Sequence, residues 1–153
     1  MGSNAITTIS SAWNASYRLA QIRLNDWDTS NWTITTLTNV WQNCYSLLEL
    51  DLSNWDLSNN VITGLGSTWS GCYSLYKLDV STWDTEKWEV SSLGYTWANC
   101  RSLTKLDVDN WNTTNWKVTN LNSTWSFCIS LAELNISNWN TSNWKVTNLT
   151  ATF

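Results

Sequence analysis

The sequence contains no histidine, no proline and no long apolar run, and few of its residues are charged. Without histidine, the chain lacks the commonest general base and the commonest metal ligand of proteins. The net charge of −4 excludes the positive footprint that is typical of proteins that bind nucleic acid or anionic membranes. The longest apolar runs are only a few residues, so we expect no membrane insertion.

Tryptophan is abundant instead: the chain has 14 tryptophans, and they recur with a period of 28 residues. A fixed period in this range is typical of one structural unit stacked on itself. With 42% apolar and 13% charged residues, the composition is that of a folded protein. We predict a single repeat domain over residues 1–153. Its parts are a partial repeat at 1–12, full repeats at 13–40, 41–68, 69–96, 97–124 and 125–152, and the start of another repeat at residue 153.

Within each repeat, the spacing L-x-x-L-x-V predicts a short strand. In the fourth full repeat these positions are Leu103, Leu106 and Val108, with Asp107 between the last two. Because side chains alternate along a strand, Leu106 and Val108 should face the core and Asp107 should face solvent. No polar residue takes the three inward positions in any full repeat.

The rest of the repeat is a polar tract followed by a second apolar segment. Residues 109–115 are rich in Asn, Asp and Thr, which form tight turns without proline. Trp116, Val118 and Leu121 then predict a second short strand, and W-x-x-C-x-S-L predicts a short helical or 3₁₀ corner. Repeated without insertions, this order predicts a mainly β fold: a right-handed parallel β-solenoid of the leucine-rich-repeat type, with five 28-residue rungs.

The four cysteines, Cys44, Cys72, Cys100 and Cys128, also stand 28 residues apart. Disulfide frameworks have unequal spacings and zinc sites use close cysteine pairs, and neither pattern is present. The sequence favours a column of buried free thiols, because free cysteine behaves as a small apolar residue. Rungs about 4.8 Å apart would also permit a disulfide between neighbouring cysteines.

The tryptophans fall into three columns. The first two are aromatic in every full repeat, and we interpret them as core. The first holds Trp13, Trp41, Trp69, Trp97 and Trp125, continued by Phe153, and the second holds Trp27, Trp55, Trp83, Trp111 and Trp139.

The third column has Asn60 in the second full repeat. An asparagine at a buried tryptophan site would leave a cavity and an unpaired amide, so we expect this column at the rim or on the surface. Its rings are the candidate ligand-binding residues, because flat aromatic faces can stack on sugars or pack against a protein. Alternatively, they only cover a corner of the repeat. The four residues are Trp32, Trp88, Trp116 and Trp144.

No group of residues predicts catalysis or a cofactor. Paired carboxylates can act as acid and base in glycosidases, but the aspartates occupy columns in which other repeats have Asn or Arg. This interchange favours solvated or turn-capping roles. The aspartate tract also lacks the glycine-rich loop of calcium-binding repeats. We predict no enzyme, no metal site and no cofactor.

The longest motif is W-x-x-C-x-S-L followed by L-x-x-L-D-L-S. It is found at Trp69-Ser-Gly-Cys72-Tyr-Ser-Leu75 with Leu78-Asp79-Val80-Ser81, and residues 115–121 (NWKVTNL) match the tail. Over all five repeats this unit resembles the BspA-like leucine-rich repeats of bacterial surface proteins and lipoproteins. Trp replaces the usual Phe, and the tail has an extra Trp-Lys-type dipeptide. The resemblance implies a surface-located, leucine-rich-repeat-like β-solenoid for adhesion or protein interaction, without catalytic residues.

We therefore expect a non-catalytic structural or interaction module of a bacterial surface protein, acting in adhesion or as a spacer. Carbohydrate binding by the third tryptophan column and an engineered repeat scaffold without a natural ligand are the alternatives. The expected partner is a protein or a cell-surface glycan, and uncapped ends would allow a homo-oligomer by end-to-end stacking. Residues 1–12 lack the features of a signal peptide, so we expect an extracellular protein whose signal and anchor lie outside these 153 residues.

Overall fold

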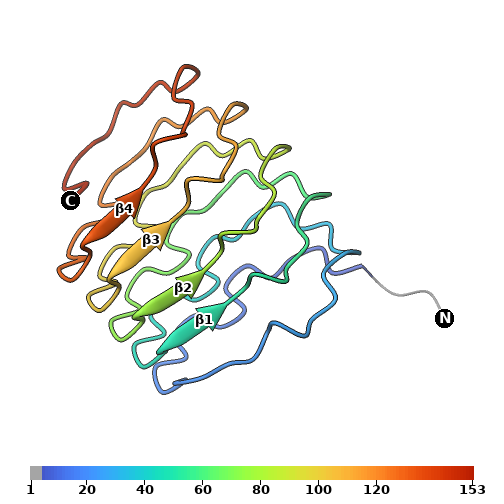
Figure 1. Ribbon diagram of the computed structural model, residues 1–153, viewed down its shortest axis with the longest axis vertical. Coiled ribbons are helices and arrows are strands. Elements are labelled where there is room, and N and C mark those ends of the chain that lie inside the picture. The colour runs from blue at the N-terminus through green and yellow to red at the C-terminus, as the bar shows by residue number, and fades with distance from the viewer. Residues whose placement is uncertain (1–4) are drawn as a thin grey trace.

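The computed structural model describes residues 5–153, and its strands follow the 28-residue period. β1 (Glu49–Asp51), β2 (Lys77–Asp79), β3 (Lys105–Asp107) and β4 (Glu133–Asn135) lie in chain order along one face (Figure 1). β1 pairs with β2 and β3 with β4, both in parallel and with each residue opposite the residue 28 positions later. The predicted strand is thus present in the second to fifth full repeats.

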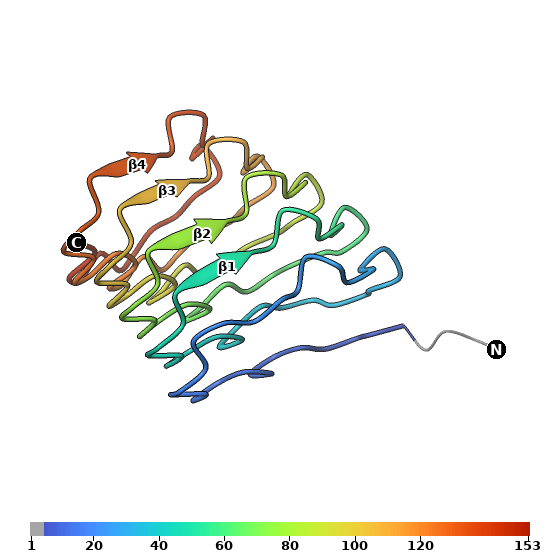
Figure 2. The same ribbon diagram turned by 60° about the horizontal axis from the view of Figure 1, so that its bottom comes forward.

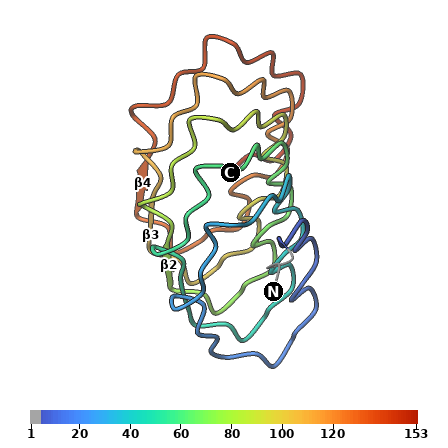
Figure 3. The same ribbon diagram turned by 90° about the vertical axis from the view of Figure 1, so that its right-hand side faces the viewer.

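Outside the strands, the chain of each repeat returns through turns to the start of the next strand, and successive repeats stack on one another with similar paths (Figures 2 and 3). Backbone bonds join neighbouring loops there too, as where Trp41 N donates to Thr68 O at 2.9 Å. The second predicted strand is reduced to single parallel bridges, such as Gly64 with Ser92. Residues 5–153 form no helix long and apolar enough to cross a membrane. The architecture is therefore mainly non-helical, with short parallel strands in two small sheets.

The corner before each cysteine is not helical, so the prediction of a helical or 3₁₀ corner is wrong. Cys72 N donates to Trp69 O at 3.1 Å, which alone would fit one 3₁₀ turn. However, Ser67 has a φ of 55° and Gly71 a φ of 77°, and the same two positions are left-handed in the other repeats. A left-handed residue at these positions ends each turn before a helix can continue. The corner is a run of separate hydrogen-bonded turns.

The inward strand positions form one side of the core, as the alternation predicts. Leu50 and Leu52 are buried and Asp51, between them, is exposed. The first tryptophan column stacks beside them: the Trp41 and Trp69 rings are parallel within 1°, with centroids 5.9 Å apart. Burying one Trp removes about 150–250 Å² from water, worth roughly 4–6 kcal/mol, so these columns provide much of the stability.

The second column also stacks in the core, with the Trp83 and Trp111 centroids 5.9 Å apart. Trp27, its member in the first full repeat, is an exception and is exposed. The core interpretation of these two columns is therefore confirmed for the middle repeats.

Side-chain donors join the repeats as well, each bonding a carbonyl 31 positions earlier in the chain. Cys72 Sγ donates to Trp41 O at 3.2 Å, and Thr96 Oγ1 donates to Leu65 O at 3.0 Å. Buried carbonyl groups need hydrogen-bond partners. A side-chain donor at these positions therefore supplies the hydrogen bond that a turn carbonyl of the preceding repeat would otherwise lack. The indole N–H groups of the second column make the same bond, from Trp55, Trp83, Trp111 and Trp139.

Candidate interaction surface

The third tryptophan column lies in the core, so the expectation that it lies at the rim or on the surface is wrong. Trp88 and Trp116 are fully buried, Trp32 is only 6% exposed and Trp144 is half-buried. Each ring packs against the second column: the Trp116 and Trp111 centroids are 5.9 Å apart, with an angle of 52° between the rings. Ring faces buried in this way are not available to stack on a sugar.

The prediction of a surface column was based on Asn60, which is in fact buried. Its side chain is only 2% exposed, yet neither Oδ1 nor Nδ2 has a hydrogen-bond partner. The Trp32 ring lies closer to the second column than usual, 4.9 Å from Trp55 compared with 6.0 Å between Trp88 and Trp111. The fold thus accommodates a buried unpaired amide, at a cost of about 1–3 kcal/mol, without moving the column to the surface.

The exposed aromatic column consists of tyrosines that follow the cysteine column. Tyr17, Tyr45 and Tyr73 stack in sequence, with ring centroids 4.9 and 4.7 Å apart. Tyr17 and Tyr73 are exposed and Tyr45 is half-buried. Arg101 continues the column, with its guanidinium carbon 4.9 Å from the centroid of the Tyr73 ring. The column presents tyrosine ring edges to solvent and places a cation over its last ring.

Two further side chains, Leu48 and Tyr76, are exposed, and they directly precede β1 and β2 in the chain. The Tyr76 hydroxyl donates to the Glu49 carboxylate, and this bond raises the pKa of Tyr76. Tyrosine and arginine are enriched in protein–protein interfaces, and stacked rings lose little further freedom on binding. We call the following group the tyrosine strip: Tyr17, Tyr45, Leu48, Tyr73, Tyr76 and Arg101.

A repeated tyrosine in the sequence indicates this strip, but the prediction of binding residues considered only the tryptophans. The position after the cysteine column reads Tyr, Tyr, Tyr, Arg and Ile along the five full repeats. Its neighbour in the chain, the cysteine, faces the core. An aromatic column beside an inward column is therefore expected to face solvent, where exposed aromatic groups indicate binding.

Two of the aspartates at the turns cap those turns by accepting hydrogen bonds from the serine two residues later. Asp28 Oδ1 accepts bonds from Ser30 N and Oγ at 3.1 and 2.6 Å, and Asp56 accepts the same pair from Ser58. These bonds lower the pKa of both carboxyl groups, so both are ionised at neutral pH. Across residues 5–153, no three Cys, Asp or Glu side chains are grouped to hold a metal ion.

The four cysteines are free. Burial raises the pKa of each thiol, to about 11 for Cys44 and for Cys128. Cys72 and Cys100 are more deeply buried, and burial also raises the pKa of their thiols. Because the thiolate is the nucleophile and the metal ligand, protonated thiols of this kind are structural and not reactive.

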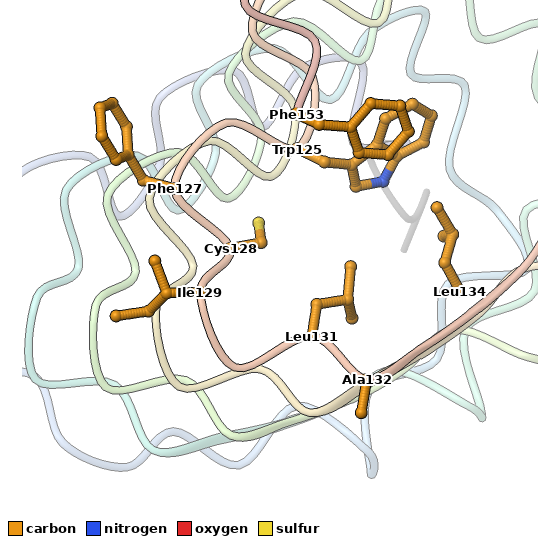
Figure 4. Close-up of a pocket in the computed structure, with 8 residues that line it drawn as sticks. All are labelled: Trp125, Phe127, Cys128, Ile129, Leu131, Ala132, Leu134 and Phe153. Atoms are coloured by element: carbon orange, nitrogen blue, oxygen red, sulfur yellow. The ribbon is translucent and has the colours of Figure 1, made fainter.

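An apolar hollow opens beside the last full repeat (Figure 4). Leu131 and Leu134 hold inward strand positions there, and the Trp125 and Phe153 rings stack at 5.3 Å. Phe127 also lines the hollow and is exposed. Trp125, Cys128, Leu131 and Leu134 of this hollow hold positions that are core in the preceding repeats, and no charged group lines it.

Comparison with known proteins identifies the family. The sequence profile of a family described as "Mycoplasma protein of unknown function, DUF285" matches residues 7–116 and 63–153. No curated protein and no solved structure matches the chain. The two matched segments overlap and together span nearly all of the sequence. The repeat protein with the buried tryptophan columns and the exposed tyrosine strip therefore belongs to the family of Mycoplasma proteins of unknown function, DUF285.

Proposed function

We propose that the protein is a non-catalytic interaction module of a bacterial surface protein, in which stacked repeats hold a binding surface for a protein partner. The observation that carries this proposal is the tyrosine strip, where Tyr17, Tyr45 and Tyr73 are held in register by stacking at 4.7–4.9 Å. A rigid aromatic surface binds with a small loss of conformational entropy. The surface location is supported by the resemblance of the repeat to BspA-like units.

We further infer that the repeats form a right-handed parallel β-solenoid of the leucine-rich-repeat type. The parallel pairing of residues 28 positions apart supports this, and the hand follows from the rule for parallel crossovers. In such a coil each repeat contacts only its neighbours, so equivalent surface residues keep a constant spacing. The resulting rod suits a spacer as well as a binding module, and both uses need a stiff column.

The chemistry of the described residues favours binding over catalysis. The turn aspartates are hydrogen-bonded caps with a lowered pKa, and the thiols are buried with a raised pKa. Carbohydrate binding by the third tryptophan column has no support from the geometry, because those rings pack on each other and on the second column. Protein binding through the strip needs neither reactive groups nor exposed ring faces.

Purified protein applied to an array of extracellular proteins and glycans tests this function. We expect binding to one or more arrayed proteins, weakened by Tyr73→Ala within the strip. Tyr95→Ala is the matched control, because Tyr95 is also exposed but lies outside the strip. A protein that binds only glycans, or binds no component of the array, would contradict the proposal.

A further inference from the structure

The strand ladder is interrupted between β2 and β3. Within the described residues, β2 pairs only with β1 and β3 only with β4, although β2 and β3 are neighbours along one face (Figure 1). A groove lies between β2 and β3. Leu78 on β2 is consequently half-buried, although Leu50 on β1 and Leu106 on β3 are fully buried. The groove is lined by residues of both strands and their flanks: Tyr76, Lys77, Asp79, Thr104, Lys105 and Asp107.

The outward charges across the interruption are arranged differently from those across the paired strands. Across the groove, Lys77 is the counterpart of Lys105 and Asp79 of Asp107, so both pairs have the same sign. Across β3 and β4, by contrast, Lys105 Nζ lies 3.5 Å from Glu133 Oε2. β1 likewise places a glutamate opposite the lysine of β2, so that only its aspartate pair, Asp51 with Asp79, has the same sign. Like charges directly opposite each other destabilise strand pairing, whereas opposite charges stabilise it.

The groove therefore presents two lysines at one end and two aspartates at the other, two positions further along the strands. Lys105 also lies 3.8 Å from Asp107, while Lys77 makes no ion pair within 4.0 Å among the described residues. Side chains two residues apart on an extended chain point the same way, about 6.6 Å apart. An extended segment with opposite charges at such positions would complement both ends of the groove.

The tyrosine strip borders this groove. Tyr76 belongs to both surfaces, and Thr104, which lines the groove, lies three residues after Arg101 of the strip. A segment bound along β2 and β3 would meet the outward charged side chains of both strands, and aromatic groups at its side. The charges and the rings give such a complex its selectivity.

We propose that the β2–β3 groove and the tyrosine strip dock an extended protein segment that carries an acidic and a basic side chain two residues apart. This inference rests on the proposed function, because it names the partner chemistry for the same interaction surface. The acidic side chain binds between Lys77 and Lys105, and the basic one binds between Asp79 and Asp107.

A displayed library of random peptides, selected on the full chain, tests the docking site. We expect the selected peptides to share an acidic and a basic residue at alternate positions. A synthetic copy of a selected peptide should bind at least about fivefold more weakly to Lys77→Gln and to Asp79→Asn. Both replacements suit the fold, because Gln21 and Asn135 hold the equivalent positions in other repeats.

Lys145→Gln is the matched control, since it removes the same charge from an exposed lysine outside the groove and the strip. Its affinity for the peptide should equal that of the unchanged protein. Selected peptides without the paired charges, or with equal affinity for the groove variants, would overturn the docking site and leave the interaction function standing. Failure to select any peptide also counts against the docking site. The proposed interaction function is tested separately by the array of whole proteins.

Discussion

The Cys100 thiol donates a hydrogen bond to the backbone carbonyl of Trp69, 31 residues earlier, with an Sγ–O distance of 3.2 Å. The same relation joins Cys44 to Trp13, where the distance is 3.1 Å. The cysteine column is thus a set of donors that satisfies the carbonyls of the preceding corner. This explains why a small, weakly polar residue stands at a position that is otherwise part of the core.

Replacing Cys44 with serine should make stability less sensitive to alkaline pH. Burial raises the pKa of Cys44 from 9.0 to about 11, so the thiol ionises first in the unfolded chain. Its contribution is fully present below pH 9.0 and is lost as pH rises to about 11. We expect the free energy of unfolding to fall more steeply over this range in the unchanged protein than in Cys44→Ser, as measured by urea denaturation.

Serine retains a donor for Trp13, and Ser16 already holds this position in the first full repeat. All other ionisable groups are the same in both proteins, so their contributions cancel in the comparison. Equal slopes for the two proteins would contradict a raised thiol pKa.

Replacing Asn60 with tryptophan should stabilise the protein. Asn60 is buried with both amide atoms unpaired, in a column that has tryptophan in the other full repeats. The replacement removes the unpaired amide and lets a ring pack between Trp32 and Trp88. We expect the free energy of unfolding to rise by about 1–3 kcal/mol in chemical denaturation. Asn59→Trp, at the exposed neighbour, should give no such gain, and a destabilised Asn60→Trp would show that the site cannot admit a ring.

Replacing Phe127 with asparagine should also stabilise the protein. Phe127 has a φ of 59°, and the equivalent positions of the second to fourth full repeats hold Asn43, Gly71 and Asn99 with φ of 61°, 77° and 62°, while the first has Ala15. Asparagine tolerates this left-handed conformation better than a bulky side chain, so we expect a gain of about 1 kcal/mol. Thermal unfolding measures it, and Phe127→Ala separates the backbone effect from removal of an exposed ring. A gain as large in the alanine variant would refute the backbone explanation.

The strands and the inward columns were predictable because the period and the alternation act together. A fixed spacing of 28 residues places like residues over one another, and alternation then decides that Leu50 faces the core and Asp51 faces solvent. Both signals depend only on residue type and position. They also predicted the first two tryptophan columns, which have no polar member in any full repeat.

The corner and the third tryptophan column could not be predicted in the same way. Trp69 and Cys72 have the spacing of a helical turn, but the left-handed Gly71 between them directs the chain elsewhere, and an alanine, an asparagine or a phenylalanine does so in the other full repeats. For the third column, the inference from Asn60 assumed that a buried amide must be paired. The free energy gained by stacking the other rings exceeds that local cost.

The tyrosine strip and the interrupted ladder depend on which residues face each other. The repeated tyrosine after the cysteine column indicated an exposed column, but only the stacking distances show an ordered one. The like charges of Lys77 and Lys105 are visible in the sequence once the register is known. Their effect on pairing is a balance of small energies that a pattern of residue types does not determine.

Replacing Lys77 with glutamine should close the ladder between β2 and β3. The change removes the like-charge pair with Lys105 and leaves an amide opposite Glu49. We expect slower hydrogen exchange at the backbone amides of residues 77–79 and 105–107, with a gain in stability of about 0.2–1 kcal/mol. Lys145→Gln, which removes an equal charge elsewhere, should leave exchange in both strands unchanged. If exchange at the two strands stays fast in Lys77→Gln, charge repulsion is not what separates them.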